Sequence, residues 1–309
     1  MNTITLPTEP EKLTRKTLTA DHPTWCPGCG DYVVLSSYLR VLEKRQLQHE
    51  NIVTLAGIGC SSRLPYFVNT HGAHFIHGRT VPFASGVSLA RPDAHVFVFG
   101  GDGDGFSIGG NHLEHGARKN INLTYVIMDN FVYGLTKKQT SPTSPIGFKT
   151  KTDPGGAVDR PVNPIKKVLS AGATFVARTH ASQVNHMTQM IERAMDHQGF
   201  SVVEVLSECV QFFSDAFDAG NPRKGGEFKV IEEKKGDGTP EDELRHDVTD
   251  EVAAYRLADL AFPGLFGVFY KGDQPTKNLV EQKLIDSTRA KYNGASDLDL
   301  LQKTFDRMK

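Results

Sequence analysis

The sequence predicts an α/β protein in which a parallel sheet carries helices on both faces. Short runs of apolar and β-branched residues alternate with longer segments whose apolar positions recur at helical spacing, and this alternation is typical of a parallel sheet. The predicted strands are residues 51–59, 95–101, 123–130, 173–179 and 201–208. The predicted helices are residues 31–47, 81–90, 107–120 and 182–198.

Composition narrows the class of protein. The 309 residues include 39% hydrophobic and 23% charged residues, so a well-buried core is expected. The formal net charge is −1 and no basic stripe is present, which argues against nucleic-acid binding. No stretch approaches the length of a membrane span, and the first twenty residues lack the apolar run of a signal peptide. We therefore expect a cytoplasmic protein with reduced thiols and no membrane partner.

The chain changes character near residue 214. Residues 1–214 hold the strand and helix patterns and are predicted to form one domain. Residues 215–309 are more polar and show no strand–helix rhythm, so we expect an extended C-terminal arm that packs on another subunit. Within the first domain, residues 134–164 are rich in Pro, Gly and Thr and predict a long ordered loop, a feature that is usually functional.

Oxygen ligands follow two of the predicted strands. The strand 95–101 runs into Gly101, Asp102 and Gly103, and the next strand ends at Asn130. In an open parallel sheet the carboxyl ends of strands are where ligands bind, and the helix that follows favours an anion. Asp102, Asn130 and the Val132 carbonyl would give three oxygens to Mg²⁺, whose other positions would belong to phosphate and water. This spacing resembles the diphosphate-binding motif of thiamine diphosphate enzymes.

The four cysteines are Cys26 and Cys29, in "WCPGCG", and the solitary Cys60 and Cys209. A thioredoxin-type dithiol requires a strand directly before Cys26, which the sequence lacks, and it leaves the two solitary thiols without a role. Cys60 and Cys209 each follow a predicted strand, so both should reach the edge that carries Asp102. One Cys-x-x-Cys joined by two distant cysteines favours a cubane iron–sulfur cluster, with a structural zinc site as the alternative.

Several motifs together resemble one family. "WCPGCGDY", "GIGCSSR", "HGR", "GDGDGFSIGGNHLEH" and "DNFVYGLTKKQTSPTSP" are similar to the β subunit of the 2-oxoacid:ferredoxin oxidoreductases, most closely the 2-oxoglutarate type. The resemblance covers roughly residues 20–215. It implies a parallel-sheet thiamine diphosphate-binding fold with thiamine diphosphate, Mg²⁺ and one [4Fe-4S] cluster. It also implies a separate α subunit that carries the pyrimidine-binding domain and the activating glutamate.

The resemblance assigns residues by position. Cys26, Cys29, Cys60 and Cys209 match the cluster ligands, and Asp102, Asn130 and Val132 match the magnesium ligands. The matching cofactor contacts are Ile58, Gly59, Cys60, Ser61, His77, Gly101, Gly103, Asp104, Gly134 and Leu135. His77 is interpreted as a polar group near thiamine that handles protons. Relatives often have Gly where this chain has Lys138, so the loop conformation, and with it the direction of the Lys137 side chain, can differ from that in the relatives.

The expected activity is coenzyme A-dependent oxidative decarboxylation of 2-oxoglutarate to succinyl-CoA with reduction of ferredoxin, or the reverse carboxylation, in an (αβ)₂ hetero-oligomer. Arg63 and Lys137 are candidate contacts for the second carboxylate of 2-oxoglutarate. Three alternatives stay open: a pyruvate or broad-specificity enzyme of this family, a non-redox thiamine enzyme with structural zinc, and a non-catalytic iron–sulfur module. The histidines of "THGAHFIHGR" and "HLEH" lack the spacing of a zinc protease and are not expected to bind metal.

Overall fold

A seven-stranded sheet forms the centre of the protein in the computed structural model, which describes residues 12–233, 245–292 and 294–308. The strand order is β2-β1-β3-β4-β6-β5-β9, with β9 antiparallel to β5 and all other neighbours parallel. The strands are β1 Ile52–Ala56, β2 His71–His74, β3 His95–Gly101, β4 Leu123–Asp129, β5 Phe175–His180, β6 Phe200–Leu206 and β9 Gly267–Lys271. The predicted fold class is confirmed.

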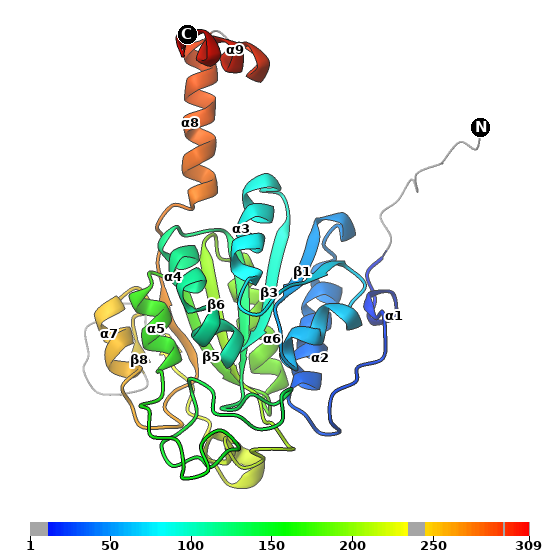
Figure 1. Cartoon of the computed structure of the whole chain (residues 1–309), viewed down its shortest axis with the longest axis vertical. Coiled ribbons are helices and arrows are strands. Elements are labelled where there is room, and N and C mark those ends of the chain that lie inside the picture. The colour runs from blue at the N-terminus through cyan, green and yellow to red at the C-terminus, as the bar shows by residue number, and fades with distance from the viewer. Residues whose placement is uncertain (1–11, 234–244, 293, 309) are drawn as a thin grey trace, which may run out of the picture.

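Helices cover both faces of this sheet (Figure 1). One face carries α2 and α6, and the other carries α3, α4 and α5, with α7 packed beside α5. Their bounds are α2 Asp31–Arg45, α3 Thr80–Ala90, α4 Gly110–Arg118, α5 Pro164–Ser170, α6 Val184–Asp196 and α7 Glu251–Leu257. The remaining short elements are α1 Arg15–Leu18 and the two-residue strands β7 Glu232–Glu233 and β8 Arg245–His246.

The strand sequences explain why the sheet is buried on both sides. Along β3, Phe97 and Phe99 face the α2–α6 core, whereas Val96 and Val98 face the core under α3 and α4. All seven residues of β4 are buried. Continuous apolar runs of this kind are typical of parallel strands that have helices on both faces.

The C-terminal third departs from the sequence prediction in one respect. Residues 215–309 do contain regular elements, because α7 packs beside α5, and β9 pairs with β5 to form the edge strand of the sheet. The run "GVFYK" has the alternation and aromatic content of a strand, and burial of Val268 and Phe269 draws it into the main core. The expectation of an arm without strand–helix rhythm is therefore wrong for residues 251–271. Residues 234–244 of the predicted arm, and residues 1–11 of the predicted first domain, lie outside the described residues.

Two helices extend beyond the body of the protein. α8 Lys277–Lys291 and α9 Asp297–Arg307 project away from the sheet (Figure 1), and none of their described side chains is buried. The start of α8 is fixed where the Asn278 side chain donates to the Ser88 carbonyl. This anchor lies at the amino ends of the parallel strands, so the projecting helices leave the molecule at the edge opposite Asp102 and Asn130.

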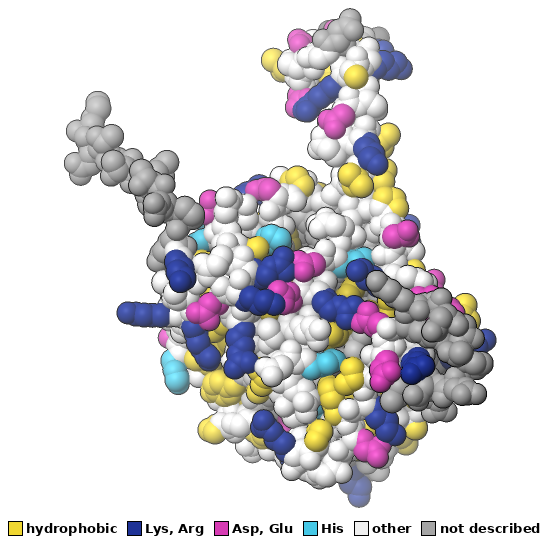
Figure 2. Space-filling view, turned by 180° about the vertical axis from the view of Figure 1, so that it is seen from behind, with side chains coloured by type: hydrophobic (Ala, Val, Ile, Leu, Met, Phe, Trp, Pro, Cys, Tyr) yellow, Lys and Arg dark blue, Asp and Glu magenta, His cyan; other side chains and the backbone are white. Residues whose placement is uncertain are grey.

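Charged side chains do not gather by sign on the face shown in Figure 2, where basic and acidic groups are interspersed. Ion pairs such as Lys44–Glu192 link α2 to α6 at the surface. This pattern agrees with the near-neutral net charge. Within the described part of the chain, none of the helices combines the length and the apolar composition that a membrane span requires.

Candidate functional site

The residues predicted to carry chemistry meet at the carboxyl ends of the parallel strands. Cys60 follows β1, Asp102 follows β3, Asn130 follows β4 and Cys209 follows β6. Because β1, β3, β4 and β6 are successive neighbours in the sheet, four distant chain segments arrive at one edge.

A cavity of about 530 Å³ opens at this edge. It is lined by every residue predicted to contact the cofactor or magnesium, namely Ile58, Gly59, Cys60, Ser61, His77, Gly101, Asp102, Gly103, Asp104, Asn130, Val132, Gly134 and Leu135. We call it the cofactor cavity. The structure brings these residues together, while their individual roles stay predictions.

Asp104 organises one wall of the cofactor cavity. Its Oδ1 accepts hydrogen bonds from the Ile58 N–H at 3.0 Å, the Gly78 N–H at 2.8 Å and His77 Nδ1 at 2.7 Å. A carboxylate that accepts from Nδ1 fixes the tautomer of the ring and leaves Nε2 of His77 free for a proton transfer. Asp104 therefore positions both the backbone after β1 and the predicted proton-handling group.

A buried pair of carboxyl groups lies behind the magnesium-type ligands. The Thr143 hydroxyl is 2.8 Å from Asp102 Oδ2 and 2.8 Å from Asp129 Oδ1. Since a hydroxyl can donate its proton to only one of them, the other carboxyl must be protonated. Burial raises the pKa of Asp102 to about 6, whereas burial and the nearby charges of Asp102 and Glu204 raise the pKa of Asp129 much further above its ordinary value. Asp129 is thus the acid, and Asp102 is the carboxylate offered to a cation.

The loop between β4 and α5 forms the remaining wall. Residues 134–163 contain no helix or regular strand, as predicted. Phe131, Lys137 and Lys138 have φ of 60°, 76° and 68°, in the left-handed region that favours glycine. The position at which relatives often carry Gly therefore does require a glycine-like backbone here, and Lys138 adopts it.

This loop also supplies cavity residues that sequence reasoning missed. The additional lining residues are Tyr133, Thr136, Gln139, Thr140 and Thr152. A bridge between Tyr133 and Gln139 folds the loop back over the cavity. The run of hydroxyl and amide side chains in "GLTKKQTSPTSP" indicates candidate lining residues. That the loop folds back over the cavity could not be predicted from composition.

All four thiols line a second cavity of about 440 Å³, which we call the thiol cavity. Cys60, Asn130, Gly134 and Leu135 line both cavities and form the wall between them. A Cβ added at Gly134 would lie 3.6 Å from the sulfur of Cys209 and 3.7 Å from that of Cys60. At Gly134 the two cavities are thus separated by a single residue without a side chain.

Burial favours the neutral form of Cys29, Cys60 and Cys209 in the absence of a cation. It is the largest cause that raises the pKa of Cys29, Cys60 and Cys209, with the pKa of Cys60 at about 12 and the charge of Asp31 adding to each effect. Reactive dithiols have a lowered pKa, so this environment argues against a thioredoxin-type function. Metal-bound thiols are deprotonated outright, which makes the set suitable for metal binding.

The four thiols line the thiol cavity and do not converge on one position. Among the described residues, no three His, Cys, Asp or Glu side chains are arranged around one position that could hold a single metal ion. A cubane cluster binds each thiolate through a different iron, so its ligands are more widely spread than those of one zinc ion.

Two hydrogen bonds join the segments that carry the thiols. The Trp25 indole N–H donates to the Cys60 carbonyl at 2.6 Å, and the Gly30 N–H donates to the Glu208 carbonyl at 3.2 Å. A Cβ at Gly30 would lie 2.5 Å from Ser207 Oγ and 2.9 Å from the Glu208 backbone nitrogen, so this close approach requires glycine. Neither contact was predicted from the sequence.

The two predicted substrate cations, Arg63 and Lys137, both line the thiol cavity beside the shared wall. Neither side chain has a hydrogen bond or ion pair to another described residue. They therefore border the thiols rather than the cofactor cavity, and their role in substrate binding stays a prediction. Among the histidines, His71 and His74 lie three residues apart on β2 and so point to opposite faces of that strand.

Comparison with known proteins identifies the family. Residues 38–205 match the family described as "Thiamine pyrophosphate enzyme, C-terminal TPP binding domain". The chain is 36% identical over 260 residues to "2-oxoacid:ferredoxin oxidoreductase 1, subunit beta" of Aeropyrum pernix, an alignment that covers 84% of this chain and 80% of that protein. The chain belongs to the β-subunit family of the 2-oxoacid:ferredoxin oxidoreductases. The resemblance predicted from the sequence motifs is confirmed.

Relatives in this family carry more specific names. "2-oxoglutarate oxidoreductase subunit KorB" of Mycobacterium tuberculosis is 46% identical over 233 residues, which are 75% of this chain and 62% of that subunit. The match thus spans less than two thirds of that relative. A solved "2-oxoglutarate:ferredoxin oxidoreductase from Magnetococcus marinus with 2-oxoglutarate, coenzyme A and succinyl-CoA bound" superposes with a TM-score of 0.82 at 36% identity, covering 96% of this chain and 97% of that one.

Proposed function

We propose that this chain is the β subunit of a 2-oxoglutarate:ferredoxin oxidoreductase, which converts 2-oxoglutarate and coenzyme A to succinyl-CoA and carbon dioxide and reduces ferredoxin, or runs in reverse. The observation that carries the proposal is the wall shared by the two cavities at Cys60 and Gly134. It lets a carbon-centred reaction in one cavity deliver electrons to an acceptor in the other. The relatives named for 2-oxoglutarate support the choice of substrate.

The cofactor cavity has the donors for thiamine diphosphate and Mg²⁺. Asp102, Asn130 and the Val132 carbonyl would hold the ion, and the backbone from Gly101 to Gly103 would lie along the diphosphate. Thiamine diphosphate, when bound, supplies the nucleophilic carbon and the electron sink for decarboxylation of a 2-oxo acid. His77, fixed by Asp104, holds or moves a proton at Nε2.

The thiol cavity would hold one [4Fe-4S] cluster through Cys26, Cys29, Cys60 and Cys209. Such a cluster supplies a one-electron acceptor. The protein contributes burial, which excludes water, and the Trp25 and Gly30 contacts, which keep the three cysteine-bearing segments together. A zinc site in the same place would have no redox role.

Substrate choice would rest on Arg63 and Lys137. Two cations beside the shared wall that have no hydrogen bond or ion pair to another described residue suit a substrate with a second carboxylate. Lys137→Ala is expected to raise the KM for 2-oxoglutarate about tenfold more than the KM for pyruvate, which corresponds to roughly one charge-assisted contact. Steady-state kinetics with both substrates measures this difference, and equal changes in the two KM values would contradict the assignment.

The partners would be an α subunit that completes the thiamine site, coenzyme A and a ferredoxin, in an (αβ)₂ assembly located in the cytoplasm. Helices α8 and α9 would pack on a neighbouring subunit, because large apolar side chains on both helices are left exposed by the described residues of this chain. The β chain alone should be inactive.

Anaerobic purification of the complex with the α chain tests the proposal. Iron and sulfide are measured, and a visible spectrum is taken before and after 2-oxoglutarate and coenzyme A are added. We expect about four irons for each of these four-thiol sites and absorbance that bleaches with substrate. Zinc without sulfide, or a cluster that 2-oxoglutarate cannot reduce, would overturn the proposal, and stronger bleaching with pyruvate would correct the substrate.

A further inference from the structure

Cys209 lies in a tight turn that follows β6. Its carbonyl accepts from the N–H groups of Phe212 at 3.2 Å and Phe213 at 2.9 Å. These two bonds close the turn and fix the backbone that presents the thiol.

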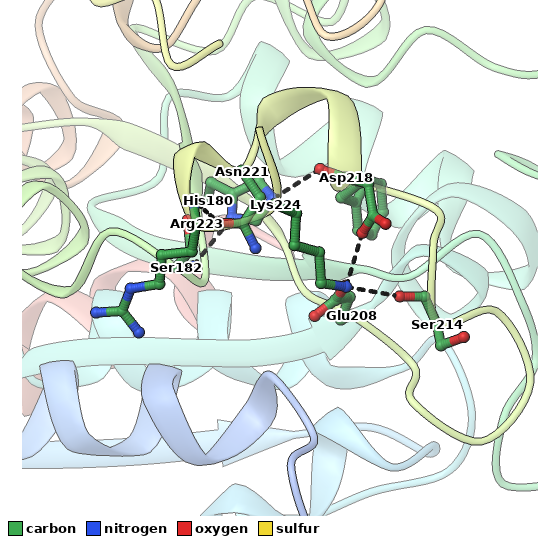
Figure 3. Close-up of polar contacts among 9 residues, drawn as sticks. His180, Ser182, Glu208, Ser214, Asp218, Asn221, Arg223 and Lys224 are labelled. Carbon is green, nitrogen blue, oxygen red and sulfur yellow. Dashed lines mark hydrogen bonds and ion pairs between the residues drawn. The ribbon is translucent and has the colours of Figure 1, made fainter. Parts of the chain in front are cut away.

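Lys224 closes this turn from outside. Its ammonium group donates to the Glu208 carboxylate, to the Ser214 carbonyl at 3.1 Å and to Asp218 Oδ1 at 2.7 Å (Figure 3). Glu208 immediately precedes Cys209 and Ser214 ends the turn, so one side chain joins both ends of the segment that presents the thiol.

The same contact reaches the Cys-x-x-Cys segment. The Glu208 side chain bonds to Lys224, while its carbonyl accepts from the Gly30 N–H, one residue after Cys29. Lys224 therefore holds the residue on which two of the three cysteine-bearing segments meet.

Lys224 is itself held in position. It ends a short 3-10 turn, Pro222–Lys224, in which the Asn221 side chain accepts from the Arg223 N–H. The Lys224 side chain is 38% exposed, and Glu208 and Asp218 are 18% and 41% exposed. The hydrogen bonds that Lys224 donates to Asp218 and Glu208 raise its pKa, so it stays charged over the working pH range.

Arg223 provides an internal comparison. It is the neighbouring cation, but its guanidinium points away from these contacts in Figure 3 and has no hydrogen bond or ion pair to any other described residue. Removal of Arg223 takes the same charge from the same turn without opening the contacts to Glu208 and Ser214.

We infer that Lys224 is a positioning residue for the iron–sulfur cluster, which sets the reduction potential of the cluster by fixing the Cys209 turn and neutralising Glu208 and Asp218 beside it. This inference rests on the proposed function. Without the lysine, two carboxylates adjacent to a thiolate ligand lose their cation, and added negative charge disfavours the reduced cluster. The turn that presents Cys209 also loses the side chain that joins its two ends.

The test compares Lys224→Met, Lys224→Arg and Arg223→Ala with the wild type as anaerobically purified αβ complexes. The readouts are iron content, the electron paramagnetic resonance spectrum of the reduced cluster and its midpoint potential. We expect Lys224→Met to make reduction about tenfold less favourable, which is about 59 mV for one electron. Its spectrum should broaden, Lys224→Arg should restore most of both properties, and Arg223→Ala should resemble the wild type.

Each outcome decides between the explanations. Equal midpoint potentials and spectra for Lys224→Met and the wild type would overturn the inference. A shift of the midpoint potential in Arg223→Ala as large as that in Lys224→Met would also overturn it, because it would show a general effect of charge. If Lys224→Met does not assemble, Glu208→Gln, which removes one of the two carboxylates, must still shift the midpoint potential, in the opposite direction, while Lys224→Arg must stay close to the wild type. A wild-type complex without any iron–sulfur cluster would instead refute the proposed function.

Discussion

Burial raises the pKa of acidic groups in both the cofactor cavity and the thiol cavity, but the two cavities offer different ligands. In the first, Asp102 is the carboxylate offered to a cation, beside Thr143 and the protonated Asp129. In the second, burial favours the neutral thiols of Cys29, Cys60 and Cys209 until a metal centre deprotonates them. The comparison indicates that one sheet edge can prepare a hard-cation site and a soft-metal site side by side, because each strand end contributes a different donor.

The largest effects should separate the two cavities. In the αβ complex, Cys209→Ser is expected to lower ferredoxin reduction by about a hundredfold or more, since a cluster ligand is lost, while thiamine diphosphate binding is retained. Asp102→Asn should weaken Mg²⁺ and thiamine diphosphate binding by more than about a hundredfold, because loss of an outer-shell partner alone costs 10–100-fold. Iron analysis and calorimetric titration with thiamine diphosphate measure the two losses independently.

Cys209→Ser leaves a side chain of nearly the same size, so it serves as its own packing control. Loss of iron in Asp102→Asn, or loss of cofactor binding in Cys209→Ser, would mean that the two cavities form one cooperative site.

A smaller effect is the dependence of stability on pH. Each cavity has a buried carboxyl whose pKa is raised to about 6 by burial. This carboxyl is Asp102 in the cofactor cavity and Asp31 in the thiol cavity. Unfolded aspartate titrates near pH 3.9, so the folded chain binds more protons between about pH 4 and 6. These groups therefore lower stability as pH rises through that range, and the loss is complete above pH 6. Mg²⁺ with thiamine diphosphate neutralises Asp102 alone and should raise the Tm more at pH 7.5 than at pH 5.

Thermal unfolding of the β chain with and without the cofactor measures this difference. Asp31→Asn should raise the Tm at pH 7.5 and leave the increment from the cofactor unchanged. An increment that is equal at both pH values would show that Asp102 is not the group to which the cation binds.

The smallest effect concerns the loop between β4 and α5, which forms one wall of the cofactor cavity. Lys138 has a φ of 68°, and a non-glycine residue in this region costs about 1–3 kcal/mol, whereas glycine adds about 0.4–1 kcal/mol of chain entropy to the unfolded state. Lys138 also lies over the Phe148 ring, a contact that glycine would lose. Lys138→Gly should therefore change the free energy of unfolding by less than about 1 kcal/mol, measured in urea. A loss above about 2 kcal/mol would mean that the lysine side chain supports the wall.

The sequence was sufficient to predict the fold class and the strand-end residues of both cavities, because these depend on local patterns, whereas the loop residues of the cofactor cavity were missed. Strand ends carry the donors, and parallel pairing brings strand ends together, so Asp102, Asn130, Cys60 and Cys209 could be placed before any coordinates. The loop from 134 to 163 was recognised by composition.

What could not be predicted depends on long-range contacts. Thr143 bridges Asp102 and Asp129 across distant loop and strand segments, and Lys224 reaches back to Glu208 from a polar stretch that looked unstructured. β9 was missed because its partner β5 lies about ninety residues earlier, and only pairing makes a five-residue run into a strand. A single sequence gives no register for such contacts.

The stripe of apolar side chains on α9 has a consequence for the life of the protein in the cell. Leu298, Leu301 and Phe305 recur at helical spacing and are 73%, 51% and 52% exposed. Copies of this chain made in excess of their partner subunit would leave the apolar side chains of α9 exposed, a feature that chaperones and proteases recognise. The same helix that is proposed to join subunits would then mark orphan copies for removal and so keep subunit numbers matched.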